Sequence, residues 1–277
     1  MPYYGTTLDK FAGLARAKRD ALSTNPVGFV VASIMAGAYV GIGIILIFSL
    51  GDQLELGTRR LVMGASFGIA LTLVVFAGSE LFTGHTMYMT QGLLSGRTSV
   101  LDLFKVWIVG WYGNLLGAFL LGWLFVVGGS DILGKPDGLL YATVAKKMSG
   151  SPESLIARAA LCNWLVCLAL WTAARTENDT AKCVLIFWCL FAFIASGFEH
   201  SVANMTLFSI ALLSPHAETI SLWGGFLQSG SCLLRQCPQR RALHGRGVLA
   251  GGRWKCGQRP EDGQRSARTV GLREVRA

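Results

Sequence analysis

The chain has 277 residues, of which 52% are hydrophobic and only 15% are charged, against about 25% charged residues in an ordinary soluble domain. Its mean hydropathy is +0.47. So few charges cannot cover the surface of a soluble globule, and intrinsic disorder requires low hydrophobicity. The composition therefore excludes both classes for most of the chain and predicts an all-α polytopic membrane protein.

The net charge of +9 is distributed very unevenly along the chain. Residues 1–220 contain 14 Lys and Arg against 13 Asp and Glu, so residues 221–277 hold nearly all of the excess positive charge. This composition shift predicts a boundary at about residue 221. We expect an amphipathic cytoplasmic segment over 1–26, a transmembrane domain over 27–220, and an aberrant basic tail over 221–277.

Five uncharged or nearly uncharged runs lie in the predicted transmembrane domain, at residues 27–50, 61–96, 106–130, 159–174 and 183–217. The second and the fifth are longer than one simple span requires. After them only a short apolar stretch precedes Arg235, so a sixth span is missing or replaced. The excess of Lys and Arg in alternate loops favours a cytoplasmic N-terminus.

The two longest runs contain similar segments, which indicates an internal repeat. GSELFTGHTM at 78–87 matches GFEHSVANMT at 197–206, with a Gly, a Glu, small or hydroxyl residues and a Met in each. Such compositions interrupt a helix at membrane depth, where freed backbone must line a cavity or be buried in protein. Paired breaks in two inverted halves indicate a binding site near the membrane midplane.

Ionisable residues within membrane segments are costly, so Glu80, Glu199 and His200 are candidates for function. For the two glutamates, a structural role in holding the broken segments together is the alternative, and for His200 it is a satisfied core histidine. We interpret His85 as structural. The motif GNLLG at 113–117 contains small residues at a spacing that permits close helix packing, and packing is the role that we expect for it.

Three segments together resemble the formate/nitrite transporter family: residues 78–87, CNWLVCL at 162–168 and ASGFEHSVANM at 195–205. The resemblance extends from about Asn25 to about Leu213, and the form containing His85 is similar to the family's bacterial nitrite channels. It implies a pentamer of aquaporin-like inverted-repeat subunits, each with its own pore and with broken second and fifth spans. It also implies cytoplasmic termini. The chain has no metal-ligand spacing such as H-x-x-x-H, and we expect no cofactor or metal.

The resemblance assigns roles to individual residues. His200 would be the central pore histidine and Thr83 its hydroxyl partner, while Asn163 and Glu199 would line the pore beside them. Lys147 would be a vestibule cation that attracts anions. The other assigned residues are Phe67 and Leu71 at a cytoplasmic constriction, Phe193 at a periplasmic one, and Glu80 and His85 in the loop motif of the second span.

These roles predict transport of nitrite, and of formate as a related substrate, across the bacterial inner membrane. Apolar constrictions exclude hydrated ions, and a bare anion crosses them only at high cost. Nitrite and formate are conjugate bases of weak acids, so protonation removes that cost. Imidazole exchanges protons near neutrality, and whether His200 donates the proton or only stabilises the anion is open. The expected partners are these anions, protons, membrane lipids and other copies of the chain.

Residues 221–277 depart from the family, because they lack the second Gly-Asn-x-x-Gly motif that its sixth span carries. Their richness in Arg, Gly and Cys suggests a shifted reading frame in a GC-rich gene. We expect this tail to be disordered and the chain to be impaired by it. Two alternatives stay open: a basic tail that binds anionic lipid or nucleic acid, and a membrane enzyme that uses Glu199 and His200. We expect neither nucleic-acid binding nor enzyme activity.

Overall fold

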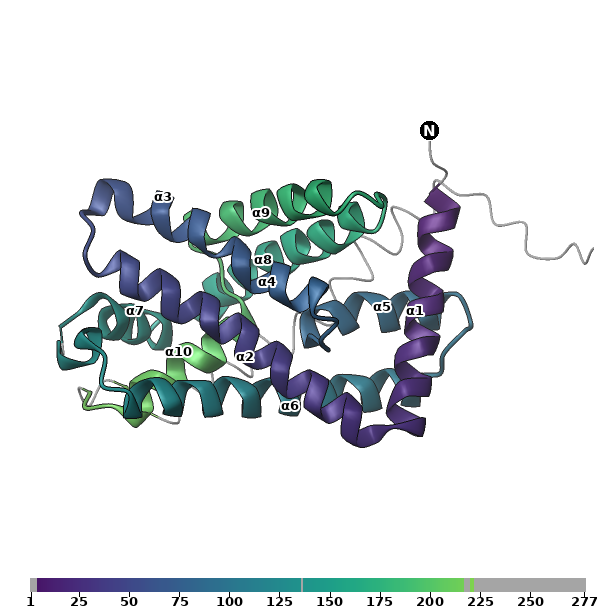
Figure 1. Ribbon diagram of the computed structural model, residues 1–277, viewed down its shortest axis with the longest axis horizontal. Coiled ribbons are helices and arrows are strands. Elements are labelled where there is room, and N and C mark those ends of the chain that lie inside the picture. The colour runs from purple at the N-terminus through teal and green to yellow at the C-terminus, as the bar shows by residue number, and fades with distance from the viewer. Residues whose placement is uncertain (1–3, 136, 217–219, 222–277) are drawn as a thin grey trace, which may run out of the picture.

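The computed structural model describes residues 4–135, 137–216 and 220–221, and every regular element in these ranges is a helix. The helices form an elongated bundle, and α1 crosses one end of it (Figure 1). In chain order they are α1 (Tyr4–Thr24), α2 (Pro26–Gly51), α3 (Leu56–Ser66), α4 (Gly68–Phe76), α5 (Phe82–Leu94), α6 (Val100–Val127), the short 3₁₀ helix η1 (Asp131–Gly134), α7 (Leu139–Met148), α8 (Pro152–Ala173), α9 (Asp179–Ala195) and α10 (Ser201–Leu213).

Four stretches of helix in the described ranges are long and apolar enough to cross a membrane, namely α2, α3 with α4, α6 and α8. Helix α2 has 26 residues, and at 1.5 Å per residue it is about 39 Å long. This exceeds the hydrocarbon thickness of about 30 Å. Asn25 begins the helix by accepting the backbone N–H of Gly28 at 2.9 Å. The prediction of an all-α polytopic protein is confirmed.

The second and fifth predicted spans are both interrupted. Helix α4 ends at Phe76 and α5 begins at Phe82, while α9 ends at Ala195 and α10 begins at Ser201. Gly78 and Gly197 lie at the same place in the two breaks, with φ of 70° and 71°. Because these values are in the left-handed region that residues with a Cβ avoid, each break requires glycine at this position.

The centre of the bundle is a close crossing of α2 and α6. A Cβ atom on Gly37 would lie 2.0 Å from the backbone oxygen of Asn114, and one on Gly117 would lie 1.9 Å from that of Ile34. No side chain fits between the two backbones there. The predicted packing role of the 113–117 motif is therefore present, and the crossing fixes α2 and α6 beside the first break.

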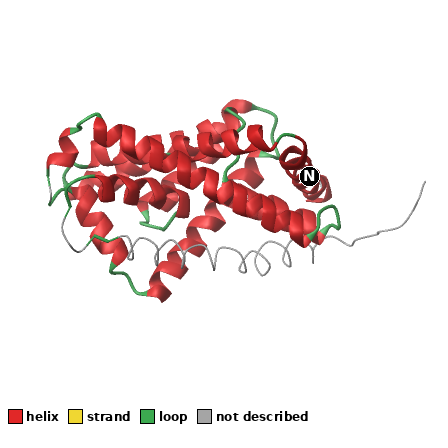
Figure 2. Cartoon of the chain, turned by 90° about the horizontal axis from the view of Figure 1, so that it is seen from below, coloured by secondary structure: helices red, strands yellow, loops and turns green. Residues whose placement is uncertain are grey.

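Helix α1 contacts several parts of the bundle, and Figure 2 shows it nearly end-on at the edge. Its inner face, formed by Thr7, Leu8, Phe11, Ala12 and Ala15, is buried. Asp9 pairs with Arg97 of the loop after α5 at 2.8 Å, and Lys10 donates to the backbone oxygen of Ala174 at 3.2 Å. The amphipathic segment expected over 1–26 is thus a docked helix, within the residues that the structure describes.

A further contact between distant segments lies outside the predicted membrane spans. Asp52 follows α2, and its carboxylate accepts hydrogen bonds from Lys135 at 2.7 Å and from the backbone N–H of Leu139 at 3.3 Å. The hydrogen bond from Lys135 holds the pKa of Asp52 below its usual value. This contact joins the end of α2 to the start of α7. The predicted sixth-span defect and the predicted disordered tail fall on 221–277, which apart from Ser221 lie outside the described residues.

Candidate functional site

His200 and Thr83, which the resemblance pairs, lie where the helices after the two breaks begin, and they meet in the structure. The Nδ1 of His200 accepts a hydrogen bond from the backbone N–H of Ala203 at 3.1 Å. The Nε2 of His200 lies 3.5 Å from the hydroxyl oxygen of Thr83. Because Nδ1 accepts, the neutral ring carries its proton on Nε2, where it can be donated toward Thr83. Both side chains are buried.

His200 lines a chamber of about 10 Å³. A cavity of this size holds about one water molecule. The remaining walls of the chamber are apolar, and they are formed by Val40, Phe67, Ala70, Leu71, Leu81, Val166, Leu190 and Phe193. A charged molecule entering the chamber would therefore lose its hydration and find compensating polar contact only at the His200 wall.

The predicted constriction residues do not lie at two separate ends of a pore. The rings of Phe67 and Phe193 are 5.5 Å apart, centroid to centroid, in an edge contact. The ring of Phe193 in turn stacks on that of His200, with centroids 5.9 Å apart and planes 13° apart. Leu71 lines the same chamber. Phe67 and Phe193, which the resemblance assigns to opposite constrictions, therefore lie side by side next to His200.

A larger cavity of about 260 Å³ lies beside the chamber, between α1, α4, α5 and α8. Leu71 and Leu81 line both spaces, so they form the wall between them. Leu81 was not predicted as a site residue. Its signal in the sequence is its place directly after Glu80, which matches the place of His200 after Glu199.

The larger cavity has a positive rim. Its basic lining residues are Lys10, Lys18 and Lys182, and the acidic one is Glu80. The rest of the lining is mainly apolar and includes Phe11 and Leu14 of α1. Lys18 pairs with Glu80, and Lys182 pairs at 2.7 Å with Asp179, which does not line the cavity. The sequence alone does not indicate that these lysines share a cavity, because their common location depends on how α1 and α9 dock.

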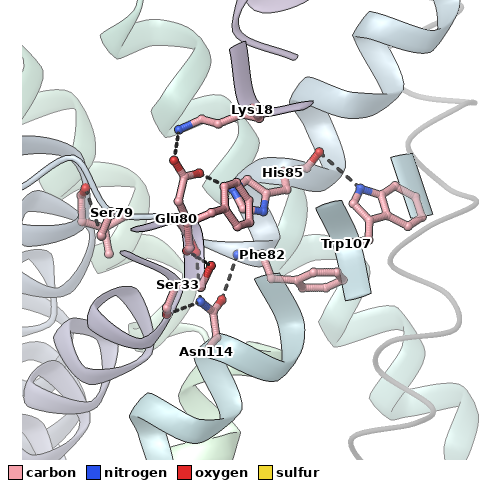
Figure 3. A network of polar contacts seen from close by, with 10 residues as sticks. Lys18, Ser33, Ser79, Glu80, Phe82, His85, Trp107 and Asn114 are labelled. Carbon is pink, nitrogen blue, oxygen red and sulfur yellow. Dashed lines mark hydrogen bonds and ion pairs between the residues drawn. The ribbon is translucent and has the colours of Figure 1, made fainter. Parts of the chain in front are cut away.

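Glu80 joins α1 to the first break. Its carboxylate lies 2.5 Å from the Nζ of Lys18 and 2.6 Å from the Nε2 of His85 (Figure 3). His85 is fully buried, and its backbone oxygen accepts a hydrogen bond from the indole of Trp107 at 3.3 Å. The carboxylate is thus held by two elements at once. This geometry supports the structural role that was an open alternative for Glu80 and the expected one for His85.

Glu199 is held in the corresponding way in the second break. Its carboxylate pairs with Lys147 of α7 and accepts a hydrogen bond from the side-chain amide of Asn204 at 2.9 Å. Lys147, predicted as an anion-attracting cation, is therefore an ion-pair partner of Glu199. Its side chain keeps 17% of its surface exposed, so it still presents positive charge to solvent on this side.

Asn163 lies on α8, where it is buried. It is one helical turn before Val166, which lines the chamber, so the two share a helix face. In the described part of the chain, no cluster of three or more His, Cys, Asp or Glu side chains could hold a metal ion. His200 is the polar residue that lines the chamber, and the hydroxyl of Thr83 lies behind it at 3.5 Å from Nε2.

Residues 9–230 match the family model described as formate/nitrite transporter. The nitrite transporter NirC of Salmonella typhimurium is 49% identical over 218 residues, which are 79% of this chain and 81% of the relative. The match extends beyond the predicted limits of Asn25 and Leu213, and it includes most of α1.

Two solved structures share the fold. A structure described as an FNT family ion channel is 44% identical, with a TM-score of 0.87 over 90% of this chain and 99% of its own. A pentameric formate channel with formate bound is 22% identical, with a TM-score of 0.63 over 81% of this chain and 94% of its own. At that identity the second likeness concerns the fold alone. Together with the family match, these similarities show that the chain belongs to the formate/nitrite transporter family.

Proposed function

We propose that the chain conducts nitrite, and formate as a related substrate, through the chamber between its two breaks. The observation that carries this proposal is the His200–Thr83 pair at one wall of an otherwise apolar chamber. The similarity to the nitrite transporter NirC supports nitrite as the main substrate. The protein would act in the bacterial inner membrane with its N-terminus in the cytoplasm, as the distribution of Lys and Arg favours.

The first step of conduction would be the attraction of anions by lysines on the two sides of the chamber. Lys18 at the larger cavity and Lys147 near Glu199 each concentrate anions at an approach to the chamber. Both are paired with a buried carboxylate, so they bring the anion close without binding it as strongly as an unpaired lysine would. Small anions therefore reach the chamber walls and can leave them again, as conduction requires.

Protonation of the anion would supply the second step. The Phe67, Leu71 and Leu81 walls offer no polar group, so a bare anion is excluded there. At His200, the Nε2–H can donate to an anion oxygen and stabilise it until it is protonated. The neutral acid then crosses the apolar wall. We infer that this coupling makes the transport of nitrite dependent on pH.

The Ala203 contact bears on the source of the proton. A doubly protonated ring would place an Nδ1–H against the N–H of Ala203 and break the hydrogen bond between them. Loss of a proton from the neutral ring at neutral pH would be far more costly. This geometry favours His200 as a hydrogen-bond donor that stabilises the anion, with water as the source of the transferred proton.

We propose a homopentamer, on the basis of the described pentameric formate channel with the same fold. Large apolar side chains on the outer faces of α2, α6 and α8, among them Phe104, Tyr112 and Trp164, are exposed in the single chain. Lipid and neighbouring subunits would cover these surfaces. An enzyme based on Glu199 and His200 gains no support, because Lys147 and Asn204 already hold the Glu199 carboxylate.

His200→Asn tests the role of the imidazole. Nitrite uptake into proteoliposomes is measured at several pH values for the wild type and the variant. We expect uptake to fall while its dependence on pH is kept, because the variant loses the Nε2–H donor beside Thr83 and the transferred proton comes from water. Thr83→Val, which removes only the hydroxyl, should reduce uptake and keep the pH dependence. Undiminished uptake by His200→Asn would contradict the donor role of His200, and a flattened pH profile would instead assign the transferred proton to the imidazole.

A further inference from the structure

The 113–117 motif does more than let two helices pack. A Cβ atom on Gly113 would lie 2.4 Å from the Cβ of Ser33, so the α6 backbone lies directly against α2. Asn114 follows Gly113 in the same contact and is fully buried. The close crossing therefore places one amide side chain between α2 and the first break.

Each polar atom of the Asn114 amide is bonded to the backbone. Its Oδ1 accepts the N–H of Phe82 at 2.8 Å. Its Nδ2 donates to the carbonyl oxygens of Glu80 at 2.9 Å and of Ser33 at 2.7 Å (Figure 3). Both amide hydrogens are used, and the two bonds to the break are made on either side of Leu81.

These bonds replace partners that the break removes. Within α5 the N–H groups of Gly84 and His85 donate to the carbonyl of Leu81, so they do not reach that of Glu80. No water is available at membrane depth for the freed groups, and an unsatisfied one is costly. The Asn114 amide satisfies the Glu80 carbonyl and the Phe82 N–H, and it ties both to α2.

We propose that Asn114 is a positioning residue of the pore, which sets selectivity by holding Leu81 in the wall of the chamber. Asn114 does not line the chamber, whereas Leu81 lines both the chamber and the larger cavity. A displaced Leu81 opens the wall to anions that keep their charge. This inference rests on the proposed function of nitrite conduction.

The residue type fits this role closely. Aspartate at position 114 would offer only acceptors, so the Glu80 and Ser33 carbonyls would both lose their donor and a charge would be buried. Leucine branches at Cγ as asparagine does and has no polar atom. Asn114→Leu therefore removes all three hydrogen bonds, although its two methyl groups take up more space than the amide.

The test compares nitrite with nitrate, the anion of a strong acid, which stays charged at neutral pH. Fluxes of both are measured in proteoliposomes containing the full chain. For Asn114→Leu we expect the nitrite-to-nitrate flux ratio to fall at least about tenfold, a factor that corresponds to about 1.4 kcal/mol. The matched control is Ser33→Ala, which removes a hydroxyl bonded to Phe29 in the same helix and keeps the carbonyl that Asn114 binds. Its ratio should be unchanged.

Leu81→Ala provides a second readout, which does not depend on the stability of Asn114→Leu. It keeps the Asn114 bonds and should lower the ratio by itself. Adding the milder Asn114→Ser should then lower it no further, because both changes act through the same side chain. An unchanged ratio in a folded Asn114→Leu protein, or additive losses in the double variant, would overturn the inference. A wild type that conducts no nitrite would instead overturn the proposed function.

Discussion

The two breaks have the same framework and present different side chains to the pore. In each, a glycine with positive φ precedes a buried glutamate by two residues. The N–H of Glu80 donates to the backbone oxygen of Ala32 on α2, and that of Glu199 donates to that of Arg158 on α8. Each break is therefore attached to the first span of its own half.

The ion pairs repeat in the same way. Lys18 of α1 and Lys147 of α7 each reach the glutamate of their own half, from a helix that precedes the first span. Each half thus begins with a lysine-bearing helix that precedes its first span. The structural unit of the repeat includes α1, which periodicity of apolar runs does not reveal.

The residue after each glutamate breaks the symmetry. Leu81 precedes α5 without a side-chain cap, whereas His200 caps α10 through Nδ1 and directs Nε2 to the chamber. The partner five residues after the glutamate also differs, because it is His85 in the first half and Asn204 in the second. The two breaks therefore share one framework and differ in a few side chains.

Removing either glutamate should cause the largest loss of stability. It tests whether the two ion pairs are equivalent. Glu80→Ala and Glu199→Ala leave a partly buried lysine without its partner, at an expected cost of about 3–5 kcal/mol in the free energy of unfolding. Titration with SDS measures this cost. Asp179→Ala is the control, because its exposed pair with Lys182 should contribute less than about 1 kcal/mol. A glutamate variant no less stable than this control would contradict the comparison.

Replacing the positive-φ glycine of either break should destabilise the protein less than removing a glutamate, and by the same amount in both breaks. Gly78→Ala and Gly197→Ala each force a Cβ into the left-handed region, and no neighbouring atom lies within 4 Å of either Cβ. The backbone strain alone should cost about 1–2 kcal/mol in each case. Gly134→Ala serves as control, since its Cβ also meets open space and its φ is not in that region. Clearly unequal costs at the two breaks would show that their backbones are not equivalent.

His85→Asn should have the smallest effect, because it gives the first half the partner that the second half already has. The neutral amide can still donate to Glu80, as Asn204 does to Glu199, so the loss of stability should be about 1 kcal/mol. Nitrite flux at neutral pH should stay within about twofold, which is under about 0.5 kcal/mol in the barrier. A loss as large as that of Glu80→Ala would assign His85 a role that Asn204 lacks.

The sequence was sufficient to predict the features that recur in both halves. The segments at 78–87 and 197–206 placed both breaks, both glutamates and His200, because glycine and ionisable residues are unusual inside apolar runs. The features that were missed depend on docking between distant segments. Lys18 pairs with Glu80 only once α1 has docked on the bundle. Asn114 reaches the first break only because the backbones of α6 and α2 are in contact.

The contacts of the predicted constriction residues also depend on packing between distant segments. Phe67 and Phe193 were separated by analogy, yet their rings touch because α4 and α9 pack beside each other. Lys147 was predicted as a cation that attracts anions, and the structure pairs it with Glu199. Sequence patterns identified which residues are unusual for a membrane segment, while their partners followed from packing.

The most direct test of the central claim measures nitrite and acid together. Proteoliposomes with a pH-sensitive dye inside are given an inward nitrite gradient, with nitrite uptake and internal pH followed in parallel. Transport of the protonated species predicts acidification of the interior in proportion to the nitrite taken up, with no membrane current. Nitrite uptake that carries current and leaves the internal pH unchanged would contradict the account.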